Sequence, residues 1–277
     1  MSTKDNPKPG DTERTLESML PIAEHEEEGR DEDGRKVRHR GVYLLPNLFT
    51  TANLFAGFYA MICAVNGNFY VASAAVFVAM VLDGLDGRVA RMTNTQSAFG
   101  AEYDSMSDMV AFGIAPALLS YQWALKELGN VGLTVAFIYA ACAALRLARF
   151  NTQIGVVDKR WFIGLASPAA AAVVSGLVWA VSEHDVYGKD LPVFASLAFA
   201  AVVAVTGLLM VSNVKYYSFK DLDLKGRVPF VVILVVVLAF AVIFSDPPRV
   251  LLLLFLIYAA SGPVNLVLRL RRIQKKK

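Results

Sequence analysis

Hydrophobic residues of this chain run in stretches of about 20, separated by short polar breaks. An α-helix rises about 1.5 Å per residue, so a stretch of this length crosses roughly 30 Å of hydrocarbon. Such runs are too long and too uniform for surface helices with one wet face. The pattern therefore predicts an all-α, polytopic transmembrane bundle of about eight helices. The expected helices cover residues 46–66, 68–90, 99–122, 130–149, 166–182, 191–212, 228–245 and 249–269.

Basic residues are distributed unevenly among the connections between these helices. Lys and Arg gather before the first helix, in alternate connections and in the C-terminal segment, whereas the opposite connections hold only Lys126, Lys189 and Arg249. Cytoplasmic connections of membrane proteins carry an excess of Lys and Arg. An even number of helices with this bias predicts a multi-pass protein of the cell (inner or plasma) membrane with both termini in the cytoplasm.

The two ends of the chain differ in composition from its apolar middle. Residues 1–40 are acidic and polar without apolar periodicity, which predicts a disordered, charged cytoplasmic tail. Residues 41–270 form the predicted transmembrane domain, and residues 271–277 form a basic tail that suits anionic headgroups. Because this topology explains the formal net charge of +3, we expect membrane lipids and no nucleic acid as partners.

Four aspartates interrupt the second and third apolar runs, in the segment DGLDGRVARMTNTQSAFGAEYDSMSD at residues 83–108. Asp83 and Asp86 lie about one helical turn apart, and Asp104 and Asp108 share a face of the next helix. If the connection between the helices folds back, the two acidic faces converge. Like charges in a low dielectric cannot all stay ionised without a cation. The pattern therefore predicts a site for one or two ions of Mg²⁺ or Mn²⁺ that faces the cytoplasm.

Glycines beside the aspartates fit a site for a bulky ligand. Gly84, Gly87 and Gly100 remove side chains where a backbone or a bulky diphosphate would come close. Two other interpretations of buried carboxylates are ion pairs with Arg88 and Arg91, and the ion relay of a transporter. Four aspartates in helical register favour the metal site over both.

The spacing D-x-x-D-G-x-x-A-R-x8-G-x3-D-x3-D resembles the signature of the CDP-alcohol phosphotransferases. Its positions here are Asp83, Asp86, Gly87, Ala90, Arg91, Gly100, Asp104 and Asp108. The resemblance implies a homodimeric membrane enzyme that transfers a phosphatidyl group from a CDP-linked lipid to an alcohol and releases CMP. It also implies that the first three aspartates bind a divalent metal pair with help from the fourth. That fourth residue, Asp108, would be the general base for the acceptor hydroxyl.

The same resemblance outlines a site for the CDP-lipid. The implied residues are Asp83, Gly87, Ala90, Arg91 and Gly100. Asn47 and Thr50 lie on a polar face of the first helix and are candidates for a contact with the nucleotide. Hydrogen bonding between helices is the alternative role for such residues.

Four further segments resemble the membrane-type phosphatidylserine synthases of bacteria and archaea. They are LPNLFTTANLFAGF (45–58), LRLARFN (145–151), GLASPAAA (164–171) and LMVSNVKYYSFK (209–220). This resemblance implies CDP-diacylglycerol as donor and L-serine as acceptor. Serine presents a carboxylate and an ammonium, so its pocket needs a cation and polar groups. The candidate serine-binding residues are Arg146, Arg149, Asn151 and Ser167.

Other interpretations stay open on the sequence. The two arginines suit an interfacial helix anchor as well as a serine site. A sister enzyme that uses glycerol phosphate or inositol phosphate would keep the motif but needs a basic pocket for the acceptor phosphate. An ion-coupled transporter would use the carboxylates without any nucleotide. The chain shows no obvious Ser-His or Cys-His nucleophile pair, which favours direct attack by the acceptor over a covalent intermediate.

Overall fold

The structure is a computed structural model that describes residues 29–30, 36–37, 44–93, 98–152, 161–182, 191–217 and 230–274. The chain divides into two units, Met1–Tyr43 and Leu44–Lys277. In the first unit, β1 (Gly29–Arg30) pairs antiparallel with β2 (Lys36–Val37). The rest of the predicted N-terminal tail, and residues 275–277 of the predicted basic tail, lie outside the described residues.

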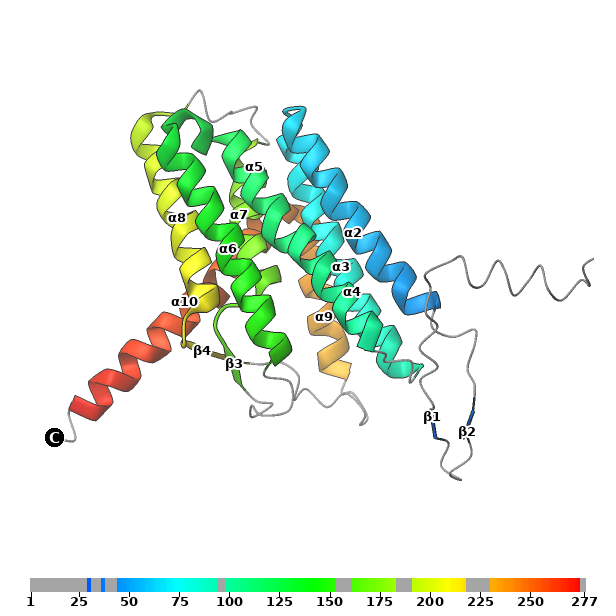
Figure 1. The fold of residues 1–277 in the computed structure, drawn as a ribbon. Coiled ribbons are helices and arrows are strands. Elements are labelled where there is room, and N and C mark those ends of the chain that lie inside the picture. The colour runs from blue at the N-terminus through cyan, green and yellow to red at the C-terminus, as the bar shows by residue number, and fades with distance from the viewer. Residues whose placement is uncertain are drawn as a thin grey trace, which may run out of the picture. The chain divides into compact units, whose positions relative to one another are not determined.

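The second unit is a bundle of helices (Figure 1). Its α-helices are α2 (Leu44–Val65), α3 (Phe69–Met92), α4 (Ala98–Asp108), α5 (Ala115–Trp123), α6 (Asn130–Thr152), α7 (Ser167–Ser182), α8 (Val193–Val211), α9 (Phe230–Ser245) and α10 (Pro247–Gln274). A π-helix, η1 (Met109–Ile114), joins α4 to α5, and a 3₁₀-helix, η2 (Leu125–Leu128), precedes α6. Each predicted segment coincides with one helix or, for residues 99–122, with the continuous run of α4, η1 and α5.

Five helices of the described part of the chain are long and apolar enough to cross a membrane. Their apolar spans are Asn47–Val65, Phe69–Ala90, Asn130–Thr152, Val193–Val211 and Pro247–Leu268. The α7 helix is also apolar but shorter. Lipid-exposed backbone must satisfy its own hydrogen bonds, which a helix does within one segment. The prediction of an all-α, polytopic membrane protein is confirmed.

The α7 helix lies at the centre of the bundle. It packs against α3, α5, α8 and α10. Residues Ala169–Ala172 are buried, and Gly176 approaches Leu252 of α10. Small side chains allow backbones to come close when no hydrophobic effect drives helices together in lipid. The alanine-rich start of α7 therefore sets how near the other helices can lie to the site described below.

The third predicted helix contains a π-helix that the sequence pattern did not predict. In η1 the backbone N–H of Ala115 bonds to the carbonyl of Val110, five residues back. Pro116 follows, and it has no N–H for the carbonyl four residues earlier, which belongs to Phe112. The Tyr139 hydroxyl of α6 donates a hydrogen bond of 3.2 Å to that carbonyl. The π-helix thus begins directly after Asp108 and changes the helix rotation there.

A short antiparallel sheet joins two connections at one end of the bundle. β3 (Trp161–Ile163) precedes α7, and β4 (Lys215–Tyr217) follows α8, with Phe162 opposite Tyr216. Gly164 adopts a φ of 82°, and its backbone approaches the carbonyl of Met210 so closely that a side chain has no room. The Tyr216 hydroxyl donates to the carbonyl of Ala259 at 3.1 Å. The sheet therefore fixes the start of α7 relative to α8 and α10.

Candidate functional site

Two aspartates project from the second half of α3. Asp83 and Asp86 lie about one turn apart, and Asp86 is buried, with 5% of its surface exposed. The Thr50 hydroxyl of α2 donates to Asp86 Oδ2 at 3.0 Å. Because α2 and α3 pack together along much of their length, this bond fixes one carboxylate against the neighbouring helix.

The other two aspartates project from α4. Asp104 and Asp108 lie one turn apart, and Asp108 is the last residue of α4 before η1. Asn53 Nδ2 of α2 donates to Asp108 Oδ1 at 3.3 Å. The Ser107 hydroxyl donates to the carbonyl of Thr50 at 3.0 Å. The α2 helix therefore contacts both acidic helices.

The carboxylates of the two helices converge. One oxygen each from Asp83, Asp104 and Asp108 lies within 4.8 Å of the other two. Asp86 contacts Asp104 from the side of α3. Asp104 Oδ1 is buried and has no hydrogen-bond partner among the described residues. The convergence of the two acidic faces, which the sequence suggested, is thus present in the fold.

The donor set suits a hard divalent cation. It consists of carboxylate oxygens, which are the ligands that Mg²⁺ and Mn²⁺ prefer. A buried carboxylate oxygen without a partner costs free energy, and a bound cation removes that cost. Asp83, Asp104 and Asp108 fit a metal together, while Asp86 lies beside them and accepts a bond from Thr50.

Open space borders the acidic cluster along α3. A Cβ atom added at Gly84 or Gly87 would meet no atom within 4 Å. Helix packing therefore does not require glycine at these two positions, and the room beside the carboxylates is available to a ligand. Ala90 is half-buried one turn further along, and Arg91 lies in the last turn of α3, although its side chain is outside the described part.

The remaining CDP-lipid candidates lie on two helices. Gly100 is in the first turn of α4. Asn47 is half-buried on α2, and its carbonyl accepts a hydrogen bond of 2.7 Å from the Thr51 hydroxyl. Thr50 is 4% exposed and bonds to Asp86, as described above. Its hydroxyl thus serves a contact between helices, which was the alternative role for these polar residues.

Arg146 brings a positive charge to the acidic cluster. It lies on α6, and its Nη1 donates to the Ser167 hydroxyl at 2.6 Å. Asp83 and Asp108 are close enough to interact with it electrostatically. Ser167 is the first residue of α7 and is fully buried, so it is held in place by the central helix. Two of the four candidate serine-binding residues therefore lie together beside the carboxylates.

The other two candidates make contacts between helices. Arg149 Nη2 donates to Asn213 Oδ1 at 2.8 Å, and its Nη1 donates to the carbonyl of Val211 at 3.4 Å. Basic side chains commonly satisfy the last carbonyls of a helix in this way, here those of α8. Asn151 Nδ2 donates to the Ser105 hydroxyl of α4 at 3.1 Å. These contacts tie the end of α6 to α8 and to α4.

Two residues near the site were not among the sequence-derived candidates. Asn53 bonds to Asp108, and Tyr258 of α10 lies close enough to Arg146 to interact with it electrostatically. The sequence did contain a signal for Asn53, because Asn53 and Thr50 are polar residues on one face of an apolar helix. Tyr258 sits in a long apolar run, and nothing in that run marks it.

Comparison with known proteins identifies related chains over most of this length. A model of the CDP-alcohol phosphatidyltransferase family matches residues 43–260. A CDP-diacylglycerol–serine O-phosphatidyltransferase of Helicobacter pylori is 38% identical over 200 residues, which are 72% of this chain and 82% of that protein. The protein of the same name from Methanocaldococcus jannaschii is 32% identical over 228 residues, 82% of this chain and 96% of that one. The protein of the same name from Bacillus subtilis is 31% identical over 176 residues, which are 64% of this chain and 91% of that protein.

Proposed function

The chain belongs to the CDP-alcohol phosphatidyltransferase family, and from this premise we propose that it transfers a phosphatidyl group from CDP-diacylglycerol to the hydroxyl of L-serine. The products are phosphatidylserine and CMP. The observation that carries the proposal is the convergence of oxygens from Asp83, Asp104 and Asp108 beside the open face of α3. The names of the relatives support serine as the acceptor.

In our proposal, two divalent ions, Mg²⁺ or Mn²⁺, would be held by the carboxylates of Asp83, Asp104 and Asp108. Asp86 borders this site. When bound, the metal supplies positive charge that neutralises the diphosphate and the departing CMP. Gly84 and Gly87 leave the space in which the diphosphate lies, and Ala90, Arg91 and Gly100 border it in our proposal. The Thr50 hydroxyl holds the Asp86 carboxylate of α3 and its carbonyl accepts from Ser107 of α4, so Thr50 links the two acidic helices.

Asp108 accepts the proton of the serine hydroxyl. The serine oxygen forms a bond to the lipid-side phosphorus while the bond from that phosphorus to the CMP oxygen breaks, and the electron pair leaves with CMP. A base gains most of its effect here from position, because a carboxylate beside metal is a weak base. We propose direct attack by the acceptor, because the sequence has no obvious Ser-His or Cys-His pair that would form a covalent intermediate.

Arg146 and Ser167 form the proposed site for the serine substrate. A guanidinium binds a carboxylate through paired N–H groups, and Arg146 lies near Asp108, where the serine hydroxyl must arrive. Ser167 orients the guanidinium from the first turn of α7. Arg149 and Asn151 support this site through their contacts with α8 and α4 and do not contact substrate in our proposal.

We place the reaction on the cytoplasmic side of the cell membrane, as the distribution of Lys and Arg indicates. We also propose a homodimer, because the family resemblance implies one. Native mass spectrometry of the protein in detergent tests the assembly: the mass of two chains supports the dimer, and the mass of one chain contradicts it.

The acceptor is tested by CMP release from CDP-diacylglycerol. Purified protein is assayed with L-serine, glycerol 3-phosphate, inositol or inositol phosphate as the only acceptor. We expect release with serine alone. Release with a phosphorylated acceptor instead would be consistent with the proposed metal site but would contradict the proposed serine site around Arg146. Loss of release with every acceptor, in protein that elutes as a folded species, would favour a transporter.

A further inference from the structure

One face of α2 contacts the helix that carries Asp108 at three successive levels. Thr50, Asn53 and Gly57 are spaced by three and four residues, so they share this face, which we call the α2 contact face. The Thr50 carbonyl accepts from Ser107, Asn53 bonds to Asp108, and Gly57 meets η1. A Cβ atom at Gly57 would lie 2.7 Å from the Cα atom of Ala111. The contacts therefore bracket the junction between α4 and η1.

Asn53 is an unusual residue for this place if its role is only to pack. Its side chain is fully buried, at 0% exposure, inside a membrane helix. Its Nδ2 reaches Asp108, but its Oδ1 has no hydrogen-bond partner among the described residues. A buried carbonyl oxygen without a partner destabilises a fold, and an apolar side chain of similar size avoids that cost. Folding stability alone therefore does not account for asparagine at this position.

The bond from Asn53 acts where the direction of Asp108 is least fixed by its own helix. Asp108 ends α4, and the helix changes to π geometry at the next residue. The terminal torsion of an aspartate side chain is broad, so the carboxylate plane is set by its hydrogen bonds. Asp83 and Asp104 lie beside Asp108 and repel its charge when no cation is bound. One amide donor on Oδ1 opposes this repulsion and selects one orientation.

We infer that Asn53 is a positioning residue for Asp108, which holds the carboxylate in the direction that the metal site and the acceptor hydroxyl require. The inference rests on the proposed role of Asp108. It adds a residue that does not touch substrate. Outer-shell hydrogen bonds of this kind typically change metal affinity or activity by about 10- to 100-fold.

The test replaces Asn53 by leucine, which has a similar size and no amide. For Asn53→Leu we expect CMP release to fall about 10- to 100-fold in kcat, while the KM for CDP-diacylglycerol stays within about threefold. We expect the melting temperature to change little, because removal of the unpaired Asn53 oxygen offsets the loss of the donor to Asp108. A residue that only packs would instead lose stability and activity together, and that result would overturn the inference.

A second readout does not depend on turnover. Binding of Mn²⁺ alone, followed by the loss of the free-ion electron paramagnetic resonance signal, should weaken about 10-fold in Asn53→Leu. In an Asp108→Ala background the same replacement should have no further effect, because the contact acts through Asp108. Unchanged Mn²⁺ binding in Asn53→Leu, or equal weakening in both backgrounds, contradicts the inference. If Asn53→Leu weakens Mn²⁺ binding only when Asp108 is present, but no CMP is released with serine, the proposed function is wrong and the inference about Asn53 stands.

Matched variants guard against an unfolded protein. Alanine is smaller than leucine and favours a helix. If Asn53→Leu does not fold, Asn53→Ala tests whether Asn53 positions Asp108. Ser73→Ala is the control, because Ser73 of α3 is also fully buried with a hydroxyl that has no partner among the described residues. It lies outside the acidic cluster, so its CMP release and Mn²⁺ binding should equal those of the wild type.

Discussion

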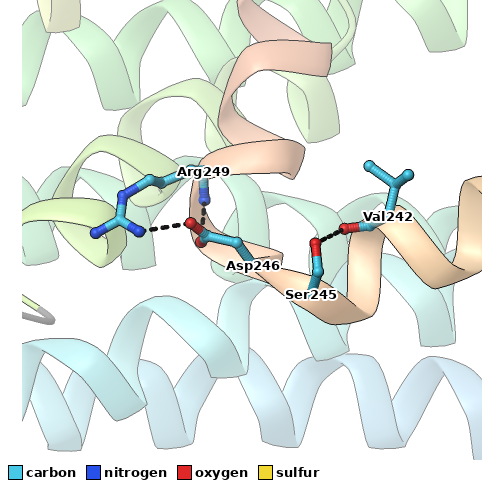
Figure 2. A network of polar contacts seen from close by, with 4 residues as sticks. All are labelled: Val242, Ser245, Asp246 and Arg249. Atoms are coloured by element: carbon cyan, nitrogen blue, oxygen red, sulfur yellow. Dashed lines mark hydrogen bonds and ion pairs between the residues drawn. The ribbon is translucent and has the colours of Figure 1, made fainter.

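At the residue scale, the role of Asp108 can be separated from a general effect of negative charge. Replacement by asparagine keeps the shape but removes the proton acceptor, so Asp108→Asn should lower the rate of CMP release by about 10²- to 10⁴-fold. The matched control is Asp246→Asn. Asp246 lies between α9 and α10 and pairs with Arg249, as Figure 2 shows, and it is not a member of the acidic cluster. Activity above half of wild type in Asp108→Asn would contradict its role as the base.

The two arginines of α6 differ in their contacts, and this difference predicts different kinetics. Arg146→Lys keeps the charge but loses the planar fork, so the KM for serine should rise by about tenfold or more while the KM for CDP-diacylglycerol changes little. Arg149→Lys should leave the KM for serine within about twofold, because Arg149 bonds to Asn213 and Val211. Equal effects on the serine KM in both variants would argue against the proposed serine site.

The sequence predicted the acidic cluster but not the partners of its members. Spacing alone placed each pair of aspartates on one helix face, and the structure brings those faces together. That Thr50 bonds to Asp86, and that Arg149 turns to α8, depends on helix rotation and on side-chain contacts between distant segments. Local patterns carry no information about such contacts between distant segments.

At the element scale, the predicted helices agree with the structure because apolar length is a strong local signal. The π-helix η1 gave no such signal. Its cause combines a local feature, Pro116, with a distant one, the hydroxyl of Tyr139 that bonds to the Phe112 carbonyl. Tyr139→Phe should therefore destabilise the fold by about 1–3 kcal/mol, because a buried carbonyl loses its donor. The measurement is the melting temperature, with Ser73→Ala as control; no change would show that η1 does not need this bond.

The close contact between α2 and η1 leads us to predict that a side chain at this point lowers stability. Gly57→Ala places a methyl group against the backbone of Ala111, which cannot give way as a side chain can. We expect a loss of about 1–3 kcal/mol in stability, seen as a lower melting temperature in detergent. Gly84→Ala is the matched control for stability, because a methyl group there meets no atom within 4 Å. If both glycine variants melt alike, the close approach of α2 and η1 is not present in solution.

At the scale of the whole molecule, the distribution of charge, and not helix packing, predicts the membrane orientation. The C-terminal segment RLRRIQKKK is strongly basic, so a fluorescent protein fused after Lys277 should fold in the cytoplasm and fluoresce. Alkaline phosphatase fused at Lys189, in a connection that is predicted to lie on the other side, should be active. The reverse pattern of the two reporters would invert the predicted orientation and place the acidic cluster on the outer face.

The proposed reaction depends on a divalent metal at the carboxylates of α3 and α4. The most direct test is CMP release from CDP-diacylglycerol and serine by protein stripped with EDTA, as Mg²⁺ or Mn²⁺ is added back. Wild-type activity should disappear on stripping and return with metal. Asp104→Asn should need a much higher metal concentration or fail to recover, because it loses the negative charge and one of the two oxygens of a carboxylate in the cluster. Full activity of the stripped enzyme, or an unchanged metal requirement in Asp104→Asn, would contradict the account.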